Sequence, residues 1–278
     1  YTLHINGRRV GKEYLTPYCN AYDAWMQVVT HDVTEFLHEG QNTLRFTLGS
    51  GWYKGRFSLM NQENIYGDRL AVIAELVLTH SDGSEERRGT DESWQIFSSA
   101  YTQNGIYDGV HIDSNLPQQH KALRIFSISK GLLHDRLSPP VTVQQEIKPV
   151  RAFHTPAGAV CLDFGQNLAG LIRVDTAQFP AADFRLRFFE TLDPDGNVYT
   201  KNLRTAKQEL VYRSNGEART IVPEFTYYGF RYVWLDADTE LPPDAFTALV
   251  LHSEMPEAGT LHTSNPTLNR LIENIEWG

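Results

Sequence analysis

The stretch AVCLDFGQNLAGLIRVDTAQFPAADFRLRF, residues 159–188, contains three short runs of the kind that form β-strands. Two apolar runs come first, Ala159 to Phe164 and Leu171 to Val174, and the segment that separates them begins with Gly165. Phe184 to Phe188 then alternates apolar and charged residues, which is the period of a strand with one buried face. Helical periodicity is almost absent here, so the stretch predicts antiparallel β-structure.

The same pattern continues on both sides of this stretch. Turns are expected at Asp195-Gly196 and Asn215-Gly216, and Asp82-Gly83 predicts a hairpin whose return strand carries the charges of residues 85–88. Further strands are expected at Tyr1 to Ile5, Asn42 to Leu48, Leu70 to Thr79, Tyr227 to Leu235 and Phe246 to His252. A short helix around Thr30 to Leu37 is compatible with this pattern. The spacing indicates an all-β fold of two consecutive antiparallel β-sandwiches that are jelly-roll-like.

A proline pair marks the expected boundary between the two sandwiches. Leu137-Ser138-Pro139-Pro140 does not suit a central strand, because proline lacks the N–H that a strand ladder requires. We therefore expect one domain at residues 1–135 and a second at residues 136–262. No internal repeat and no low-complexity tract is visible in the sequence.

Residues 263–278 break the strand pattern and predict a helix. Asn265 suits the N-cap, and Pro266 suits the first helical position. Leu268, Leu271, Ile272 and Ile275 follow at i, i+3, i+4 and i+7, which places them on one helical face. We expect this apolar stripe to open a helical domain that continues beyond Gly278. The alternative is that part of the stripe packs on the second sandwich.

Composition excludes several classes of partner. The formal net charge is −9 and the pI is about 5.6, so nucleic acid and anionic membranes are not expected as partners, whereas a neutral sugar is compatible. No apolar run approaches the roughly 20 residues of a membrane span. The two cysteines, Cys19 and Cys161, lie far apart and are interpreted as two small buried thiols. Nothing in the sequence points to a cellular compartment.

Motif searches assign no catalytic residue and no metal ligand. The segment 49–55 is glycine-rich but lacks the spacing of a phosphate loop, and 193–197 lacks the glycine and glutamate of a calcium loop. His111 and Asp113 are too few for a metal site. Carboxylates that catalyse glycoside hydrolysis are brought together by the fold, so their spacing carries no signal. Asp163, Glu190 and Asp193 are interpreted as structural acids.

An aromatic loop is the better functional lead. Trp52 and Tyr53, with Lys54 and Arg56, are followed by Asn61, Asn64 and Tyr66. Flat rings beside amides suit sugars, which present apolar C–H faces and hydroxyl rims. We therefore name Trp52, Tyr53, Asn61 and Tyr66 as candidate carbohydrate-binding residues. The alternative is that Trp52 fills the sandwich core while Gly55 and Gly67 shape the loop.

Several motifs, in this order, resemble those of the bacterial α-L-rhamnosidase family. The first half contributes residues 1–7, Val10-Gly11, Tyr22, 31–34, 40–42, 51–55, 82–84, Ser93-Trp94 and Tyr107-Asp108-Gly109. The second half contributes 163–170, 195–199, 202–206, 225–233, 252–256 and 264–278. The match covers nearly the whole chain. It implies a rhamnosidase N-terminal sandwich followed by a concanavalin-like sandwich.

The resemblance also implies what the chain does. Family members remove terminal L-rhamnose with inversion, using carboxylates on an (α/α)6 barrel that would follow this chain, so no catalytic residue carries over. We expect a fragment that is inactive alone, supports the barrel by intramolecular packing and helps to position rhamnose-containing glycosides. Two alternatives remain, a stand-alone rhamnose-binding module and an active site within the sandwiches. Val110 departs from the glutamate expected after Tyr-Asp-Gly, and calcium, which some relatives bind, has no assignable ligands here.

Overall fold

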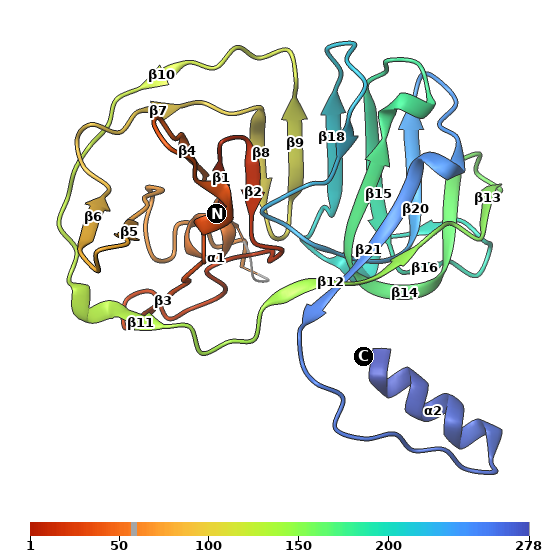
Figure 1. Ribbon diagram of the computed structural model, residues 1–278. Coiled ribbons are helices and arrows are strands. Elements are labelled where there is room, and N and C mark those ends of the chain that lie inside the picture. Colours follow the sequence, from red (N-terminus) through yellow and green to blue (C-terminus); the bar gives the residue numbers. More distant parts are fainter. Residues whose placement is uncertain (57–59, 278) are drawn as a thin grey trace.

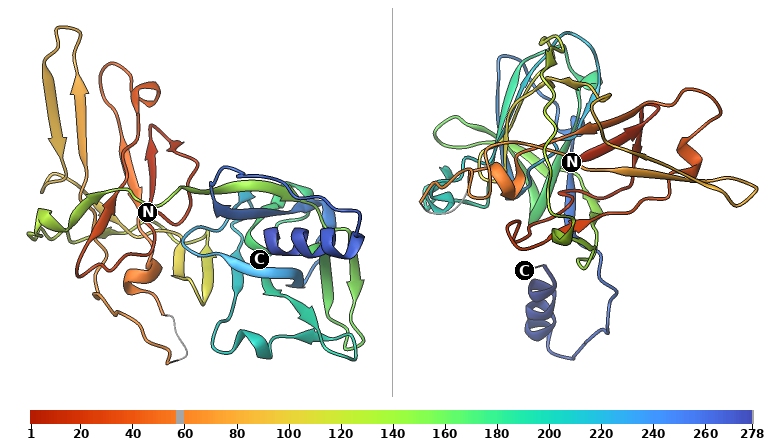
Figure 2. Two further views of the ribbon diagram at one scale, coloured as in Figure 1. Left: turned by 90° about the horizontal axis from the view of Figure 1, so that it is seen from below. Right: turned by 90° about the vertical axis from the view of Figure 1, so that its left-hand side faces the viewer.

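The computed structural model describes residues 1–56 and 60–277 of the chain. The N-terminal half, coloured red to yellow-green, lies beside the C-terminal half, coloured green to blue (Figure 1). The turned views show the same division (Figure 2). Strands dominate both halves, which confirms the all-β fold class.

Short strands in small sheets build the N-terminal half. Their bounds are β1 Thr2–Ile5, β2 Arg8–Val10, β3 Met26–Val28, β4 Leu44–Thr47, β5 Glu75–Thr79, β6 Glu85–Gly89, β7 Ile96–Phe97, β10 His120–Lys121 and β11 Leu133–Asp135. The order β2-β1-β4 forms one antiparallel sheet, and β5–β6, β7–β10 and the parallel pair β3–β11 form three more. Leu3, Ile5 and Val10 are the buried centre of this half.

A large curled sheet builds the C-terminal half and includes two strands, β8 and β9, from the first 135 residues. Its strands are β8 Tyr101–Gly105, β9 Gly109–Asp113, β12 Val141–Ile147, β13 Arg151–His154, β14 Val160–Asp175, β15 Phe184–Phe189, β18 Glu209–Arg213, β19 Thr220–Ile221, β20 Tyr228–Ala237 and β21 Phe246–Ser253. The main path runs β12-β21-β14-β20-β15-β18-β9-β8, and β13 and β19 both pair with β14. A small hairpin joins β16 Thr191–Leu192 to β17 Val198–Tyr199.

The helices are few and short. They are α1 Gly51–Lys54 and α2 Pro266–Trp277, with single 3-10 turns η1 Thr34–Phe36, η2 Lys130–Leu132, η3 Thr176–Gln178, η4 Lys201–Leu203 and η5 Pro243–Ala245. The turn η1 lies where a short helix was expected. Within the described residues, neither α-helix is long and apolar enough to cross a membrane.

Alternation along the strands explains the main core. In β15 the pattern of buried and half-buried residues follows the sequence FRLRFF, so Phe184, Leu186 and Phe188 point to the interior. The rings of Phe188 and Tyr228 stack with centroids 3.8 Å apart. On the opposite face of the sheet a smaller cluster surrounds Cys161, and it includes Phe189 and Tyr232. The main core therefore lies on one face of the sheet, and the smaller cluster covers part of the other face.

The β8–β9 hairpin connects the two halves. Both strands lie within the domain predicted at residues 1–135, yet β9 pairs in parallel with β18 of the C-terminal half, Leu210 opposite Val110. Val110 is fully buried, so an apolar side chain suits this position better than a charged one. The domain boundaries at 135/136 and 262/263 stay a prediction.

Two predictions about local structure are wrong in part. The strand expected from Leu70 begins only at Glu75, because its partner β6 ends at Gly89 and an aspartate turn at Asp91 leads the chain away. Ile73 is consequently 50% exposed. Of the two cysteines, Cys161 is buried as expected, whereas Cys19 is exposed.

The C-terminal helix forms as predicted, but its apolar stripe is uncovered. Asn265 accepts a hydrogen bond from the backbone of Thr267, which is the expected capping contact. In Figure 1 α2 stands apart from the strands of both halves. Leu271 is 53% exposed and Ile275 is 68% exposed, so the stripe does not pack on the second sandwich. Gly278, the last residue of the expected helical segment, lies outside the described residues.

Candidate functional site

The aromatic loop named from the sequence forms one cluster with a third tyrosine. Tyr53 lies on α1, and its ring stacks near that of Tyr66 with centroids 6.4 Å apart. Tyr22 packs edge-on against both, at 5.4 Å from Tyr53 and 5.0 Å from Tyr66. Tyr66 is 36% exposed, so part of its ring faces solvent. The spacing of residues 52–66 could not predict that Tyr22 joins the cluster, because Tyr22 comes from a segment that is distant in the sequence.

The two remaining candidates, Asn61 and Trp52, are not part of this ring cluster. Asn61 is exposed, and its side-chain oxygen accepts a hydrogen bond of 2.5 Å from Arg56 Nη1. Trp52 lies on α1 and is half-buried, so it does not fill the sandwich core. The binding of carbohydrate by Trp52, Tyr53, Asn61 and Tyr66 stays a prediction.

Two glycines shape this loop, as the sequence suggested. A Cβ at Gly67 would lie 2.2 Å from the Tyr53 hydroxyl oxygen. A Cβ at Gly55 would lie 2.3 Å from the backbone oxygen of Gly51. Both distances are far below a van der Waals contact, so the close approach of Tyr53 to its neighbours requires glycine here.

Arg56 ties the aromatic loop to the junction between the halves. Its Nη2 lies 2.6 Å from Asp108 Oδ1 and donates to the backbone oxygen of Thr205 at 2.8 Å. Lys207 Nζ lies 3.4 Å from the same carboxylate. Burial raises the pKa of Asp108, but the hydrogen bond and charge of Arg56 and the ammonium of Lys207 outweigh it and hold this pKa below its ordinary value. Three segments far apart in the sequence are thereby held together.

Removing the guanidinium should loosen this junction. We expect Arg56→Ala to lower the free energy of unfolding by about 2 kcal/mol, because Asp108 is left half-paired in a mostly buried place. Urea unfolding followed by tryptophan fluorescence measures the loss. Arg69→Ala is the matched control, since the ion pair of Arg69 with Asp68 is long, at 3.6 Å, and both side chains are exposed. Equal losses in the two variants would contradict the assignment.

A second buried carboxylate, that of Glu209, lies at the same junction. Glu209 Oε1 lies 2.8 Å from His111 Nε2, and Arg185 Nε donates to Glu209 Oε2 at 2.9 Å. Burial raises the pKa of Glu209, but the hydrogen bonds from His111 and Arg185 keep it below its ordinary value. His111 is thus hydrogen-bonded to a carboxylate. Together with Arg185 it links β9, β18 and β15 through Glu209.

Asp163 and Asp193 have structural contacts. Asp193 accepts backbone hydrogen bonds from Asp195 and Asn197 and so closes its own turn. Asp163 is buried beneath Arg151 and Arg231. Among residues 1–56 and 60–277, no group of three or more His, Cys, Asp or Glu side chains is arranged to hold a metal ion.

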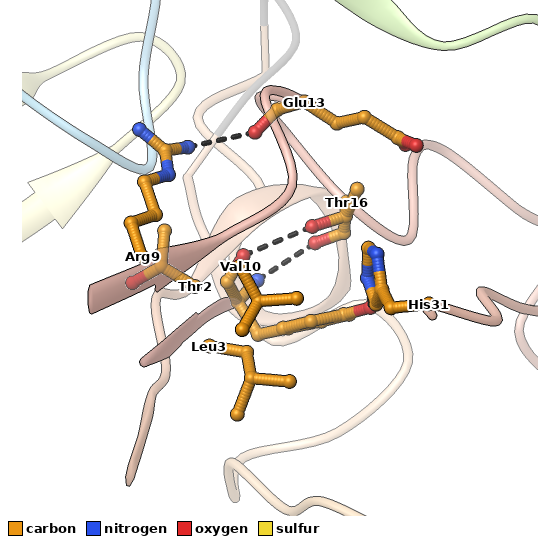
Figure 3. A pocket seen from close by; sticks show the side chains of 8 residues that line it. Thr2, Leu3, Arg9, Val10, Glu13, Thr16 and His31 are labelled. Carbon is orange, nitrogen blue, oxygen red and sulfur yellow. Dashed lines mark hydrogen bonds between the residues drawn. The ribbon is translucent and has the colours of Figure 1, made fainter. Parts of the chain in front are cut away.

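Two small cavities are too small for a sugar. One of about 10 Å³ lies beneath β1, where Tyr1, Thr16 and His31 meet (Figure 3). The other, about 90 Å³, lies near η3 and is lined by Phe179, Ser214 and Glu217 among others. Ligand pockets usually measure roughly 300–1,000 Å³, so neither of these two cavities could enclose a sugar.

Comparisons with known proteins match this architecture along its length. The family model described as the α-L-rhamnosidase N-terminal domain matches residues 1–151, and the bacterial α-L-rhamnosidase concanavalin-like domain matches residues 153–252. An α-L-rhamnosidase of Streptomyces avermitilis is 31% identical over the whole chain, which covers 28% of that protein. One from Formosa agariphila is 29% identical, with 32% of that protein covered.

Solved structures agree with these sequence matches. The α-L-rhamnosidase of Aspergillus terreus is 35% identical with a TM-score of 0.92, and the alignment covers 99% of this chain and 34% of that one. The Streptomyces avermitilis enzyme in complex with L-rhamnose is 29% identical with a TM-score of 0.89, over 99% of this chain and 28% of that one. This chain therefore spans about a third of the length of its relatives, and it belongs to the α-L-rhamnosidase family, with the N-terminal and concanavalin-like domains of that family.

Proposed function

We propose that this chain is a non-catalytic part of an α-L-rhamnosidase, that it supports a helical catalytic domain and that it helps to position rhamnose-containing glycosides. The observation that carries the proposal is the uncovered apolar stripe on α2. Leu268, Leu271 and Ile275 are exposed to solvent, although burying each would gain roughly 1.5–3 kcal/mol. A helical partner that covers this stripe would recover that free energy and fix the sandwiches against it.

The covering of α2 has a direct test. We expect Leu271→Asp and Ile275→Asp to leave the urea midpoint of this chain unchanged, because both side chains already face solvent. In the longer enzyme the same substitutions should lower the midpoint and reduce hydrolysis of an aryl rhamnoside. Leu249→Asp, in the buried core of β21, is the control that should unfold either form. A large loss for Leu271→Asp in this chain alone would show that the stripe packs on its own sandwiches.

A second candidate is that the chain binds sugar on its own. The observation that favours it is the tyrosine cluster, in which the ring of Tyr66 stacks near that of Tyr53 and remains part-exposed. L-rhamnose binding to the chain, measured by calorimetry with and without calcium, should then be lost in Trp52→Ala. The chain alone should release no nitrophenol from an aryl rhamnoside, and release would instead establish an active site within the sandwiches.

A further inference from the structure

The Glu190 cluster, defined as Glu190, Asn167 and Asn202, joins three separate segments at the surface of the C-terminal half. Asn202 Nδ2 donates to Glu190 Oε2 at 2.7 Å, and Asn167 Nδ2 lies 3.3 Å from Glu190 Oε1. Both asparagines are exposed and the carboxylate is half-buried. A carboxylate and two amides are thus held side by side, facing solvent.

A bulge in β14 holds the first asparagine out of the strand ladder. Pairing with β20 shifts register between Asp163 and Leu168, and Gly165 at the bend has a φ of +76°. The Asp163 carboxylate accepts from the backbone N–H of Gly165 at 2.8 Å and is itself held by Arg231. Bulges commonly re-aim a side chain at a functional site. This one leaves Asn167 exposed beside Glu190.

A strained loop holds the second asparagine. Asn202 lies in η4, and the residue that ends this turn, Arg204, has φ 56° and ψ −103°, which is unfavourable for a non-glycine residue. Gln208 in the same loop also has a positive φ of 47°. The backbone of Lys207 donates to the oxygen of Tyr107, which anchors the loop on the junction. Strain of this kind persists at sites where the surroundings enforce it, and such sites are often functional.

The absence of a side chain at Gly229 leaves the Glu190 carboxylate accessible. A Cβ at Gly229 would find Glu190 Oε1 at 3.8 Å as its single neighbour within 4 Å among the described residues, so a larger side chain would cover this oxygen. The backbone N–H of Gly229 is satisfied by Gln208 Oε1 at 2.8 Å.

We propose that the Glu190 cluster is a binding subsite for the vicinal hydroxyl groups of a neutral sugar ring, distinct from the tyrosine cluster of the α1 loop. Two carboxylate oxygens have about four acceptor positions, and the two amides occupy half of them. Neighbouring hydroxyls can donate to the remainder and accept from or donate to the amides. The net charge of −9 disfavours an anionic ligand, and a single carboxylate is a poor site for a cation. The choice of L-rhamnose as ligand rests on the proposed function.

Nuclear magnetic resonance of the chain titrated with L-rhamnose tests the subsite. We expect millimolar binding that shifts the side-chain amide signals of Asn167 and Asn202 and the backbone signal of Gly229. Glu190→Gln keeps the shape of the side chain and should weaken binding at least tenfold. Gly229→Val should abolish it by covering the carboxylate, while the dispersion of all other signals shows that the fold is kept.

Glu35→Gln is the matched control, because it makes the same change at a glutamate of the N-terminal half that is 74% exposed, and it should leave the shifts at the Glu190 cluster unchanged. The absence of shifts at 100 mM sugar, or equal binding by wild type and Glu190→Gln, would overturn the subsite. The proposal that the chain supports a helical domain is tested separately, by the urea midpoints of the α2 variants without sugar. Either that proposal or the sugar subsite can therefore be disproved without the other.

Discussion

Replacing Gly109 by alanine is expected to lower the free energy of unfolding by more than about 3 kcal/mol. Gly109 begins β9 with a φ of +84°, opposite Glu209 of β18. An added Cβ would lie 2.0 Å from the backbone oxygen of Glu209 and 2.8 Å from its nitrogen. Because these are backbone atoms, no side chain can move aside, and β18 must separate from β9. The hydrogen bond between His111 and Glu209 would be lost with it.

Gly83 provides the matched control for this substitution. It lies in the β5–β6 turn with a nearly equal φ of +82°, but an added Cβ there meets no atom of the described residues within 4 Å. Gly83→Ala should therefore cost only the backbone strain, about 1 kcal/mol. Urea unfolding measures the free energy of unfolding of both variants. The difference between their two losses is the cost of the contact between the added Cβ and the backbone of Glu209. Similar losses would show that β9 and β18 are not packed as closely as described.

Local periodicity predicted most strands of the C-terminal half because their burial follows their sequence. The alternating run Phe184 to Phe188 became β15, and the aromatic run from Tyr227 became β20. Ala159 to Phe164 and Leu171 to Val174 were expected as separate runs, yet both belong to the single bent strand β14. The bulge between them depends on Asp163 and its two arginines, contacts that no local pattern contains.

Residues that meet across the fold account for what the sequence could not predict about the candidate site. Tyr22 joins Tyr53 and Tyr66 from another segment, and Arg56 reaches Asp108 and Thr205. The strand from Leu70 was predicted from its apolar residues, but a strand also needs a partner, and β6 ends at Gly89. The family resemblance predicted which domains occur. Motifs that follow one another in a fixed order along the chain identify a family, although they do not reveal which residues contact each other in the fold.

Replacing Asp163 by asparagine is expected to lower the free energy of unfolding by about 3 kcal/mol at pH 7. The side chain is 2% exposed, and it accepts hydrogen bonds from Arg231 Nε at 2.8 Å and from the backbone N–H of Gly165 at 2.8 Å. An amide cannot neutralise the two guanidinium groups above it. Its N–H₂ group would also face donors, so part of the buried hydrogen bonding is lost. The bulge that carries Asn167 should become mobile in the variant.

The pH dependence of this loss follows from the pKa of Asp163. Burial raises that pKa, but the Arg231 hydrogen bond, the Gly165 N–H and the guanidinium charges outweigh burial and hold it below the ordinary value of about 3.9. A carboxyl with a lowered pKa in the folded state contributes its stability above about pH 4, and this contribution disappears as pH falls through the lowered value. The difference between wild type and Asp163→Asn should therefore stay constant from pH 7 to 5 and shrink below pH 4.

Urea unfolding at pH 7, 5 and 3 measures this difference, with Glu146→Gln as the matched control. Glu146 also pairs with an arginine, Arg173, but the two side chains are 51% and 34% exposed. Water screens such a pair, so its removal should change stability by less than about 1 kcal/mol. If Asp163→Asn cost no more than Glu146→Gln, the ion pairs at the bulge would be no stronger than a surface contact, and the rigid placement of Asn167 beside Glu190 would lose its physical basis.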